Sequence, residues 1–369
     1  MKAGRKMKFT LSREKFHKAL QKVNNTIGSR STLPILGNVL IEAKDNMVAL
    51  TTTDLEIRIV THIEAEVEIP GATTVPAKRL LALVTKFEDE QVSVSSDERH
   101  HAEIVCGTSC FKLLGIAPED FPSGGELVPV RTITFKGAEL KRMLSQISYA
   151  ITLNDSRKVL HGMLVSYRDN VVTMVATDSK RLAMTERAVE NVAGGNGDCI
   201  VPLQAANEVK RQTNPQGDVT LEIGEKMARF TMEDTVLTTK LIEGNYPNFR
   251  QVIPATFLRE IPIVTSALLG KIELVSQVLS DSTGCIVLNF TEGKLELRAS
   301  NSDIGEGSTV LPVEFSGDGI SASFNPAFLS DPLRFADCET MTFKMNDGFS
   351  PVAIDGGDGF VYVIMPMRP

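Results

Sequence analysis

Residues 39–54 of the chain read VLIEAKDNMVALTTTD, and two later stretches, MLVSYRDNVVTMVATD at 163–178 and IVLNFTEGKLELRASN at 286–301, align with them without a gap. In each stretch apolar and polar residues alternate on both sides of a short turn that carries Asp, Asn or Gly, which is the pattern of a β-hairpin. The stretches start 124 and then 123 residues apart in a chain of 369 residues. The sequence therefore predicts three copies of one domain.

Each hairpin lies between two helical patterns. The pattern before the hairpin has apolar residues three and four positions apart, and the pattern after it begins near a proline, a residue that suits the start of a helix. The predicted fold is α+β, with two helices packed on antiparallel sheets in each copy. Helices are expected at residues 11–23, 75–87, 135–147, 201–213, 266–280 and 324–335, and further strands at 111–118, 237–242 and 360–367.

The repeat also sets the expected domain boundaries. Domains are expected at residues 1–128, 129–254 and 255–369, with residues 1–6 as a short N-terminal extension and either Met1 or Met7 as the natural start. With 42% hydrophobic residues, the chain has enough apolar material for several cores. No stretch approaches the roughly 18 apolar residues of a membrane-spanning helix. The basic start has no apolar stretch behind it, so the protein is expected in the cytoplasm.

The formal net charge of −7 is unevenly distributed. The expected helices sum to +9 and the rest of the chain to −16. Helices at equivalent positions of a repeat share a surface, so one interpretation is a basic helical face that binds a polyanion. The alternative is that Lys and Arg are common residues on any helix surface.

Sequence motifs indicate no catalytic residue, cofactor or metal. Neither G-x-x-x-x-G-K-[ST] nor G-x-G-x-x-G occurs, and GGNG (194–197) and GGDG (356–359) are expected to be turns. The five cysteines include no C-x-x-C pair and are expected to be free thiols, while the five histidines lack the spacing of a metal site. Asp54 and Asp178 recur at equivalent hairpin ends, which favours a turn role over a catalytic one.

Five longer motifs resemble one known family. They are TLPILGN (32–38), GATTVPAK (71–78), VATDSKRLA (175–183), NYPNFRQVIP (245–254) and YVIMPMRP (362–369). In this order they resemble the beta sliding clamps of bacterial DNA polymerase III, and the resemblance runs from Met7 to Pro369. It implies a DNA clamp fold in which two three-domain subunits close head to tail into a six-domain ring, with the helices lining the hole. It also implies a processivity factor without enzymatic activity, which encircles duplex DNA and tethers the replicative polymerase.

The resemblance further implies a site for partner proteins. In this family the replicative polymerase, a clamp-loader ATPase and other proteins insert a short peptide, roughly Gln-Leu-x-Leu-Phe, into an apolar pocket between the second and third domains. Methionines suit such a site because an unbranched thioether repacks around different peptides, although Met365 and Met367 could also simply end a core strand. The family has Gly-His where this chain has Ser179-Lys180. The pocket would be formed by Leu160, Thr177, Ser179, Lys180, Arg181, Leu182, Pro247, Gln251, Val252, Phe349, Val363, Met365, Pro366, Met367 and Arg368.

DNA contacts are implied by the same resemblance. A clamp that slides needs attraction to phosphates and no contacts to base edges. The chain has Asn154 and Lys158-Val159 where family members can carry a glutamine and two tyrosines, and it has no Trp, so base stacking is not expected. The loop residues that would touch DNA are Arg30, Asn154, Arg157 and Lys158, and the helical phosphate contacts would be Lys18, Lys22, Lys78, Arg79, Lys86, Lys141, Arg142, Lys210 and Arg211.

The subunit contact of the family would join Phe111 and Leu113 of one chain to Val278 and Leu279 of the other. From the sequence alone these four residues are interpreted as core residues. Two other functions stay open at this point. One is a hydrolase that uses an acidic cluster such as 88–90 or 119–120, and the other is a monomeric repeat adaptor that binds proteins without encircling DNA.

Overall fold

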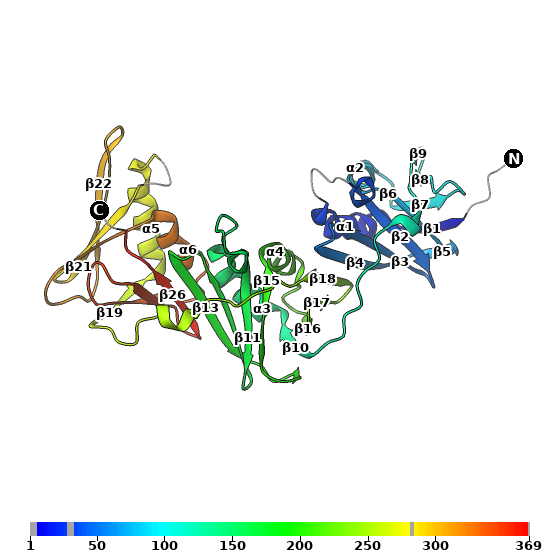
Figure 1. The fold of residues 1–369 in the computed structure, drawn as a ribbon. Helices are drawn as coiled ribbons and strands as arrows, with labels where there is room; N and C mark the ends of the chain where they lie inside the picture. Colours follow the sequence, from blue (N-terminus) through cyan, green and yellow to red (C-terminus); the bar gives the residue numbers. More distant parts are fainter. Residues whose placement is uncertain (1–5, 28–32, 281–283, 368–369) are drawn as a thin grey trace. The chain divides into compact units, whose positions relative to one another are not determined.

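The structure, a computed structural model, describes residues 6–27, 33–280 and 284–367. The chain divides into two compact units, one of Met1–Ala138 with Arg211–Leu241 and the other of Glu139–Lys210 with Ile242–Pro369. Each unit combines short helices with antiparallel sheets, as Figure 1 shows. Along the part of the chain that is described, no helix is both long enough and apolar enough to cross a membrane.

The first unit holds strands from the first and second repeats. Its helices are α1 (Arg13–Val23) and α2 (Ala77–Lys86), with the 3-10 turns η1 (Asn24–Thr26), η2 (Pro34–Gly37) and η3 (Pro118–Asp120). Its strands are β1 (Met7–Ser12), β2 (Asn38–Lys44), β3 (Met47–Thr53), β4 (Ile57–Glu64), β5 (Glu66–Ile69), β6 (Gly71–Pro76), β7 (Gln91–Ser96), β8 (Ala102–Cys106), β9 (Ser109–Leu113), β10 (Arg131–Lys136), β16 (Asp218–Ile223), β17 (Met227–Met232) and β18 (Thr235–Lys240).

The second unit holds the other strands of the second repeat and those of the third. Its helices are α3 (Gly137–Ile147), α4 (Leu203–Gln212), α5 (Thr265–Val275) and α6 (Pro326–Arg334), with η4 (Ser148–Ala150), η5 (Lys158–His161), η6 (Phe249–Val252) and η7 (Ser276–Val278); α3 begins and α4 ends in residues of the first unit. Its strands are β11 (Gly162–Arg168), β12 (Val171–Thr177), β13 (Arg181–Ala188), β14 (Val192–Ala193), β15 (Gly197–Pro202), β19 (Arg259–Val264), β20 (Ile286–Thr291), β21 (Lys294–Asn301), β22 (Gly305–Pro312), β23 (Ile320–Phe324), β24 (Thr340–Met345), β25 (Val352–Asp355) and β26 (Phe360–Ile364).

The three predicted hairpins are confirmed as β2–β3, β11–β12 and β20–β21. In the first two, both turn residues have positive φ: Asp45 and Asn46 at 51° and 58°, Asp169 and Asn170 at 48° and 68°. The third turn uses Gly293 at 67°. Asn, Asp and Gly adopt this left-handed backbone at the least cost, and it matches the twist of the paired strands.

Five of the six helices begin two residues later than predicted, because a strand still runs up to four of them and Asn325 caps the fifth, α6. Pro76 and Pro202 end the strands before α2 and α4, whereas Pro326 is the first residue of α6. Proline suits both the last residue of a strand and the first residue of a helix. It lacks a backbone N–H, and neither position needs one for a hydrogen bond. The strands expected to reach residues 118, 242 and 367 end at Leu113, Lys240 and Ile364.

Apolar residues three and four positions apart form the buried face of each helix. Helix α1 buries Phe16, Leu20 and Val23, and α5 buries Leu268 and Ile272. The two helices of a repeat pack together, as α1 does with α2 and α5 with α6. The predicted α+β class, with two helices on antiparallel sheets in each repeat, is therefore confirmed.

In the first unit one sheet continues from one repeat into the next. The strand order β10-β16-β17-β18-β4-β3-β2-β6 places β18 of the second repeat beside β4 of the first, with Thr235 opposite Thr61 and Thr239 opposite Ile57. The other sheet has the order β5-β1-β7-β8-β9. The first repeat is therefore covalently and laterally continuous with the second.

The second unit repeats this junction. Its long sheet has the order β15-β11-β12-β13-β26-β25-β24-β19, so that β13 of the second repeat pairs with β26 of the third, with Arg181 opposite Ile364. The remaining strands form the sheet β22-β21-β20-β23. Because these sheets cross the repeats, the two compact units do not coincide with them, and the boundaries at 128 and 254 stay a prediction.

Candidate functional site

Equivalent turns follow the three hairpins. The Oδ1 atom of Asp178 accepts hydrogen bonds from the backbone N–H groups of Lys180 and Arg181 at 2.9 and 3.0 Å. Asp54 accepts from residues 56 and 57, and Asn301 from residues 303 and 304, in the same way. The favoured turn role of these aspartates is confirmed, and the turn after β12 sets the position of Ser179 and Lys180.

The C-terminal segment lies along this turn. After β26, the N–H of Met365 donates to the carbonyl oxygen of Lys180 at 3.0 Å, and that of Met367 donates to Ser323 at 2.7 Å. The backbone is thus held while the Met365 and Met367 side chains remain 40% and 36% exposed. Both methionines follow β26, which ends at Ile364, and Met367 forms a β-bridge with Ser323, but neither is buried as a core residue would be.

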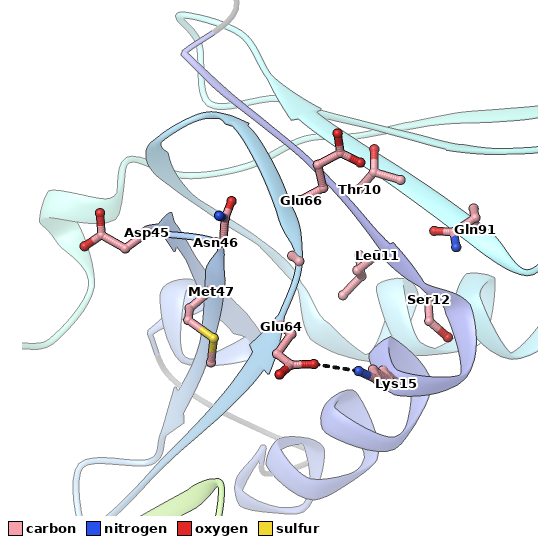
Figure 2. Close-up of a pocket in the computed structure, with 11 residues that line it drawn as sticks. Thr10, Leu11, Ser12, Lys15, Asp45, Asn46, Met47, Glu64, Glu66 and Gln91 are labelled. Carbon is pink, nitrogen blue, oxygen red and sulfur yellow. Dashed lines mark hydrogen bonds and ion pairs between the residues drawn. The ribbon is translucent and has the colours of Figure 1, made fainter.

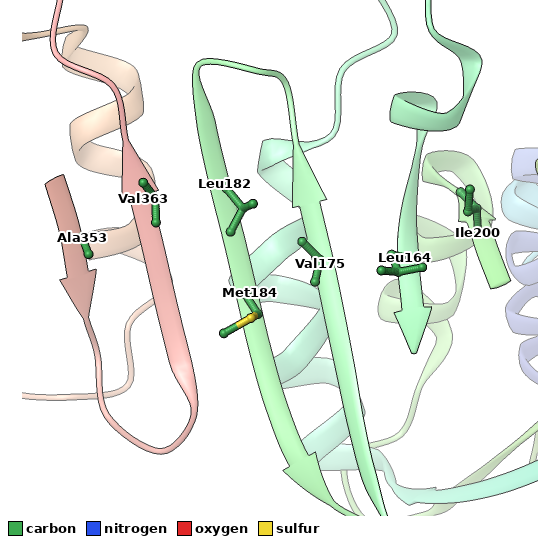
Figure 3. Packing of buried hydrophobic residues seen from close by; sticks show 7 residues of the cluster. All are labelled: Leu164, Val175, Leu182, Met184, Ile200, Ala353 and Val363. Carbon is green, nitrogen blue, oxygen red and sulfur yellow. The ribbon is translucent and has the colours of Figure 1, made fainter. Parts of the chain in front are cut away.

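A buried apolar cluster spans the β13–β26 junction, in the sheet that the segment of Met365 and Met367 leaves (Figure 3). One face of the long sheet contributes Leu164, Val175, Leu182, Met184, Ile200, Ala353 and Val363. The segment that covers the cluster contributes the partly buried Ile242, Tyr246, Phe249, Ile253 and Phe257, with Val159 and Val361 from elsewhere. We call the exposed Val252, Met365 and Met367, together with the buried Leu182 and Val363, the apolar patch.

The structure places Leu182 opposite Val363 in the β13–β26 pairing and Lys180 beside Met365, and the pocket as a whole stays a prediction. Ser179, Lys180, Pro247, Gln251 and Val252 are exposed. Leu160, Leu182 and Val363 are fully buried and can act only as support, while Thr177 and Pro366 are half-buried. Phe349 stands 77% exposed in the loop after β24, and Arg368 lies outside the described residues.

Arg181 differs from the expectation of a partner contact. Its side chain is buried and donates to Asp178 at 3.0 Å, to Asp331 at 2.5 Å and to the carbonyl oxygen of Tyr149 at 2.7 Å. Its guanidinium also lies 4.2 Å from the centre of the Phe328 ring. These contacts tie the start of β13 to α6, so Arg181 supports the site from inside.

Sequence reasoning placed Pro247, Gln251 and Val252 at the site but missed the apolar residues by which their segment covers the cluster. Tyr246, Phe249, Ile253 and Phe257 are spaced by three and four residues, a helical period, yet only η6 forms there. Prolines at 247 and 254 interrupt a longer helix. These residues could have been recognised from the sequence, because apolar side chains recur every three or four positions in a stretch whose prolines prevent a long helix.

Among the expected DNA contacts of the first unit, those on α2 are the most available. Lys78, Arg79 and Lys86 are exposed. On α1, Lys18 pairs with Glu14 of the same helix at 2.5 Å, and Lys22 pairs with Asp234 at 2.6 Å. Pairs of this exposed kind are weak enough for a phosphate to replace them. Arg211 donates to the carbonyl oxygen of Lys22 at 3.0 Å.

In the second unit the expected DNA contacts are more constrained. Arg142 forms ion pairs with Asp337 at 3.7 Å and with Asp358, which also contacts Arg187. Lys210 donates to Ser148 at 3.0 Å, and its partial burial lowers the pKa of its ammonium group. Lys141 is half-buried, whereas the loop residues Asn154, Arg157 and Lys158 are exposed. Arg30 lies outside the described residues.

The residues of the expected subunit contact lie on edges and ends. Phe111 in β9 is 42% exposed and packs against Phe87 with 5.9 Å between the ring centres, so its interpretation as a core residue is wrong. Leu113 is half-buried. Val278 ends η7, and both it and Leu279 are also half-buried.

A second, polar depression lies in the first unit, between the start of α1 and the turns at Asp45 and Glu64 (Figure 2). Lys15 Nζ donates to Glu64 at 2.8 Å, and this hydrogen bond lowers the pKa of the carboxyl group. Both side chains are well exposed, so the pair is weak. The depression contains no nucleophile held against a base, and the acidic clusters at 88–90 and 119–120 lie exposed elsewhere.

Metal and cysteine chemistry add nothing to the site. The expectation of free thiols is confirmed for all five cysteines. Within residues 6–27, 33–280 and 284–367, His, Cys, Asp and Glu side chains nowhere gather in a group of three that could hold a metal ion.

Known protein families match the chain in three consecutive segments. The N-terminal, central and C-terminal domains of the DNA polymerase III beta subunit match residues 7–125, 134–248 and 250–368. The chain is 30% identical over 362 residues to a beta sliding clamp from Chlamydia pneumoniae, covering 98% of this chain and 99% of that one. It is 28% identical over 366 residues to a beta sliding clamp from Vibrio cholerae, covering 98% and 100%.

Solved structures agree with these matches. The DNA polymerase III subunit beta from Pseudomonas aeruginosa superposes with a TM-score of 0.93 at 28% identity, covering 98% of this chain and 100% of that one. A sliding clamp from the same organism bound to griselimycin superposes with a TM-score of 0.92 at 29% identity and the same coverage. Fold, repeat and similarity together define a sliding clamp.

The chain belongs to the DNA polymerase III beta subunit family, the beta sliding clamps. The expectation from the sequence motifs is thereby confirmed, and the function is that of a DNA sliding clamp of DNA polymerase III.

Proposed function

We propose that two copies of this chain close head to tail into a ring around duplex DNA, and that partner proteins dock a short peptide on the apolar patch. The ring accounts for the repeat, and the patch accounts for the exposed methionines. The replicative polymerase, a clamp-loader ATPase and other replication and repair proteins would use the same patch. Such a processivity factor has no chemical step to perform, and it works beside the chromosome in the cytoplasm.

The main support for a ring is that sheets of successive repeats pair with each other in the same way twice. Strand β4 pairs with β18, and β13 pairs with β26, so the hairpin sheet of one repeat twice meets the other sheet of the next. The hairpin sheet of the third repeat ends at β22, and the corresponding sheet of the first repeat ends at β9. Within the described residues neither strand has a second neighbour. A third junction of the same kind would pair β22 of one copy with β9 of another.

Two such pairings close a dimer. Each copy would offer β9 at one end and β22 at the other, so a pair of chains related by a two-fold axis leaves neither β9 nor β22 unpaired. Phe111 and Leu113 lie on β9, and Val278 and Leu279 lie next to the sheet of β22, in agreement with the contact that the family resemblance implies.

Sequence-independent binding suits the charges of the helices. The exposed α2 residues Lys78, Arg79 and Lys86 can each attract a phosphate without reading a base. Each contact contributes little and is replaceable, so the protein can move along the duplex. Enclosure, rather than affinity, would then prevent dissociation.

Retention on closed and open DNA tests the ring. After loading onto a nicked circular plasmid, the protein should remain on the circle during gel filtration and be lost when a restriction enzyme linearises the DNA. Sedimentation equilibrium should give twice the 40.2 kDa mass of one chain. A protein that stays monomeric, and is retained equally on circular and linearised DNA, would instead support the monomeric adaptor.

A further inference from the structure

The turn after β12 contains a strained residue at the edge of the apolar patch. Ser179 has φ of 73°, in the left-handed region that side chains rarely adopt. Thr177 Oγ1 accepts from the N–H of Ser179 at 3.1 Å, and Asp178 closes the turn. In the first repeat Leu55 has φ of 77° in a turn with the same hydrogen bonds, so the turn itself needs no further support.

The second repeat adds one contact to this turn. The Nη2 group of Arg157 donates to Ser179 Oγ. Arg157 is itself fixed by Asp155, to which its Nε and Nη2 groups donate at 2.9 and 2.8 Å and its backbone N–H at 2.8 Å. The side-chain hydrogen bonds from Arg157 hold the pKa of the Asp155 carboxyl far below its ordinary range.

Arg157 thereby joins two segments that flank the patch. The loop of Asp155 is closed by His161, whose Nε2 lies 2.7 Å from the Asp155 carbonyl oxygen, and it leads into the fully buried Leu160. The turn of Ser179 leads to Lys180, whose carbonyl oxygen accepts from Met365. Hydrogen bonds therefore connect Asp155 to Arg157 and Arg157 to Ser179, and the next residue, Lys180, is hydrogen-bonded to Met365.

We propose that Arg157 is a positioning residue for the partner-peptide site, acting through Ser179, and not primarily a phosphate contact. This inference rests on the proposed function of the patch. The Arg157 charge is already balanced by Asp155, which weakens its attraction to a phosphate. Holding the turn in one position before the peptide arrives reduces the entropy that binding would otherwise cost. The adjacent Lys158 has no ion-pair partner among the described residues and remains available to DNA.

Binding of two probes to the full-length protein tests the proposal. The first is a fluorescein-labelled peptide ending Gln-Leu-Ala-Leu-Phe, and the second is a labelled 30-base-pair duplex at low salt, both followed by anisotropy. Arg157→Gln and Ser179→Ala should each weaken peptide binding roughly threefold to tenfold, the worth of a charge-assisted hydrogen bond at a partly exposed site. The double variant should be no weaker than Arg157→Gln, because both changes remove one interaction.

Lys158→Gln is the matched control, since it removes a neighbouring positive charge without touching Ser179. It should leave peptide binding unchanged and weaken duplex binding more than Arg157→Gln does. The proposal is overturned if Arg157→Gln binds the peptide as wild type does, or if Lys158→Gln weakens peptide binding equally. It is also overturned if the losses of binding free energy from Arg157→Gln and Ser179→Ala add up in the double variant. A wild-type protein that fails to bind the peptide would refute the proposed function of the patch itself, which is a different result.

Discussion

Arg181 shows how a single residue supports the site without facing a partner. Its buried guanidinium binds Asp178 and Asp331, so a neutral replacement would leave two carboxylates without their cation. We expect Arg181→Met to lower the free energy of unfolding by about 2–4 kcal/mol, as for other broken buried ion pairs. Thermal melts should show a clear fall in melting temperature, whereas exposed Lys158→Met should leave it nearly unchanged. Equal melting temperatures for both variants would contradict this role.

The two methionines of the apolar patch carry a second prediction. Met365→Ala combined with Met367→Ala removes apolar surface that a bound peptide would cover, so peptide affinity should fall roughly tenfold or more. The sedimentation mass should not change, because neither residue lies on β9 or β22. Met47→Ala is the matched control: this methionine is similarly exposed but lies in the first unit. Unchanged peptide affinity in the double variant would remove the patch assignment.

At the scale of elements, local chemistry made the hairpins predictable. Each hairpin turn is favoured by its own residues, which adopt positive φ: Asp45-Asn46, Asp169-Asn170 and Gly293. Helix starts were less predictable, because strand and helix follow one another without a loop. The role of Arg181 could not be predicted from the residues around it, since its partner Asp331 is 150 positions away in the chain.

The free edge strands give a prediction at this scale. Phe111→Glu places a charge on the apolar edge of β9 and should shift the sedimentation mass from a dimer to a monomer at micromolar concentration. Phe111 is already half-exposed, so the fold should survive and far-ultraviolet circular dichroism should be unchanged. Val128→Glu, at a more exposed apolar residue in the chain between β9 and β10, is the control. A dimer that persists in Phe111→Glu would exclude β9 from the subunit contact.

Helix α2 gives a prediction about DNA. Arg79→Glu should weaken binding to a duplex oligonucleotide and lower the slope of log affinity against log salt concentration by about 1, the value for one lost phosphate contact. Lys44→Glu makes the same charge change on a hairpin turn and should leave the slope unaltered. Arg142 is a poorer probe, because its pairs with Asp337 and Asp358 would be lost as well. Equal slopes for Arg79→Glu and wild type would exclude α2 from the DNA surface.

For the whole molecule, the sequence predicted three repeats of a two-helix domain but not the way their sheets meet. The pairing of β18 with β4 joins residues more than 170 positions apart, and no periodicity within either strand specifies its neighbour. Most residues of the candidate site were predicted from the resemblance of long motifs to the beta sliding clamps. The buried position of Arg181 and the covering segment of Tyr246 and Phe249 required the three-dimensional structure.

The shared sheets have a kinetic consequence. In the proposed ring, two of the three junctions in each chain are continuous with the polypeptide, and only the β9–β22 junction can separate without unfolding a domain. The residence time on circular DNA would therefore equal the time until either of the two β9–β22 junctions opens, however weakly the helices hold the phosphates. Raising the salt concentration should then speed diffusion along the duplex. The rate of dissociation from circular DNA should still depend on how long β9 and β22 stay paired.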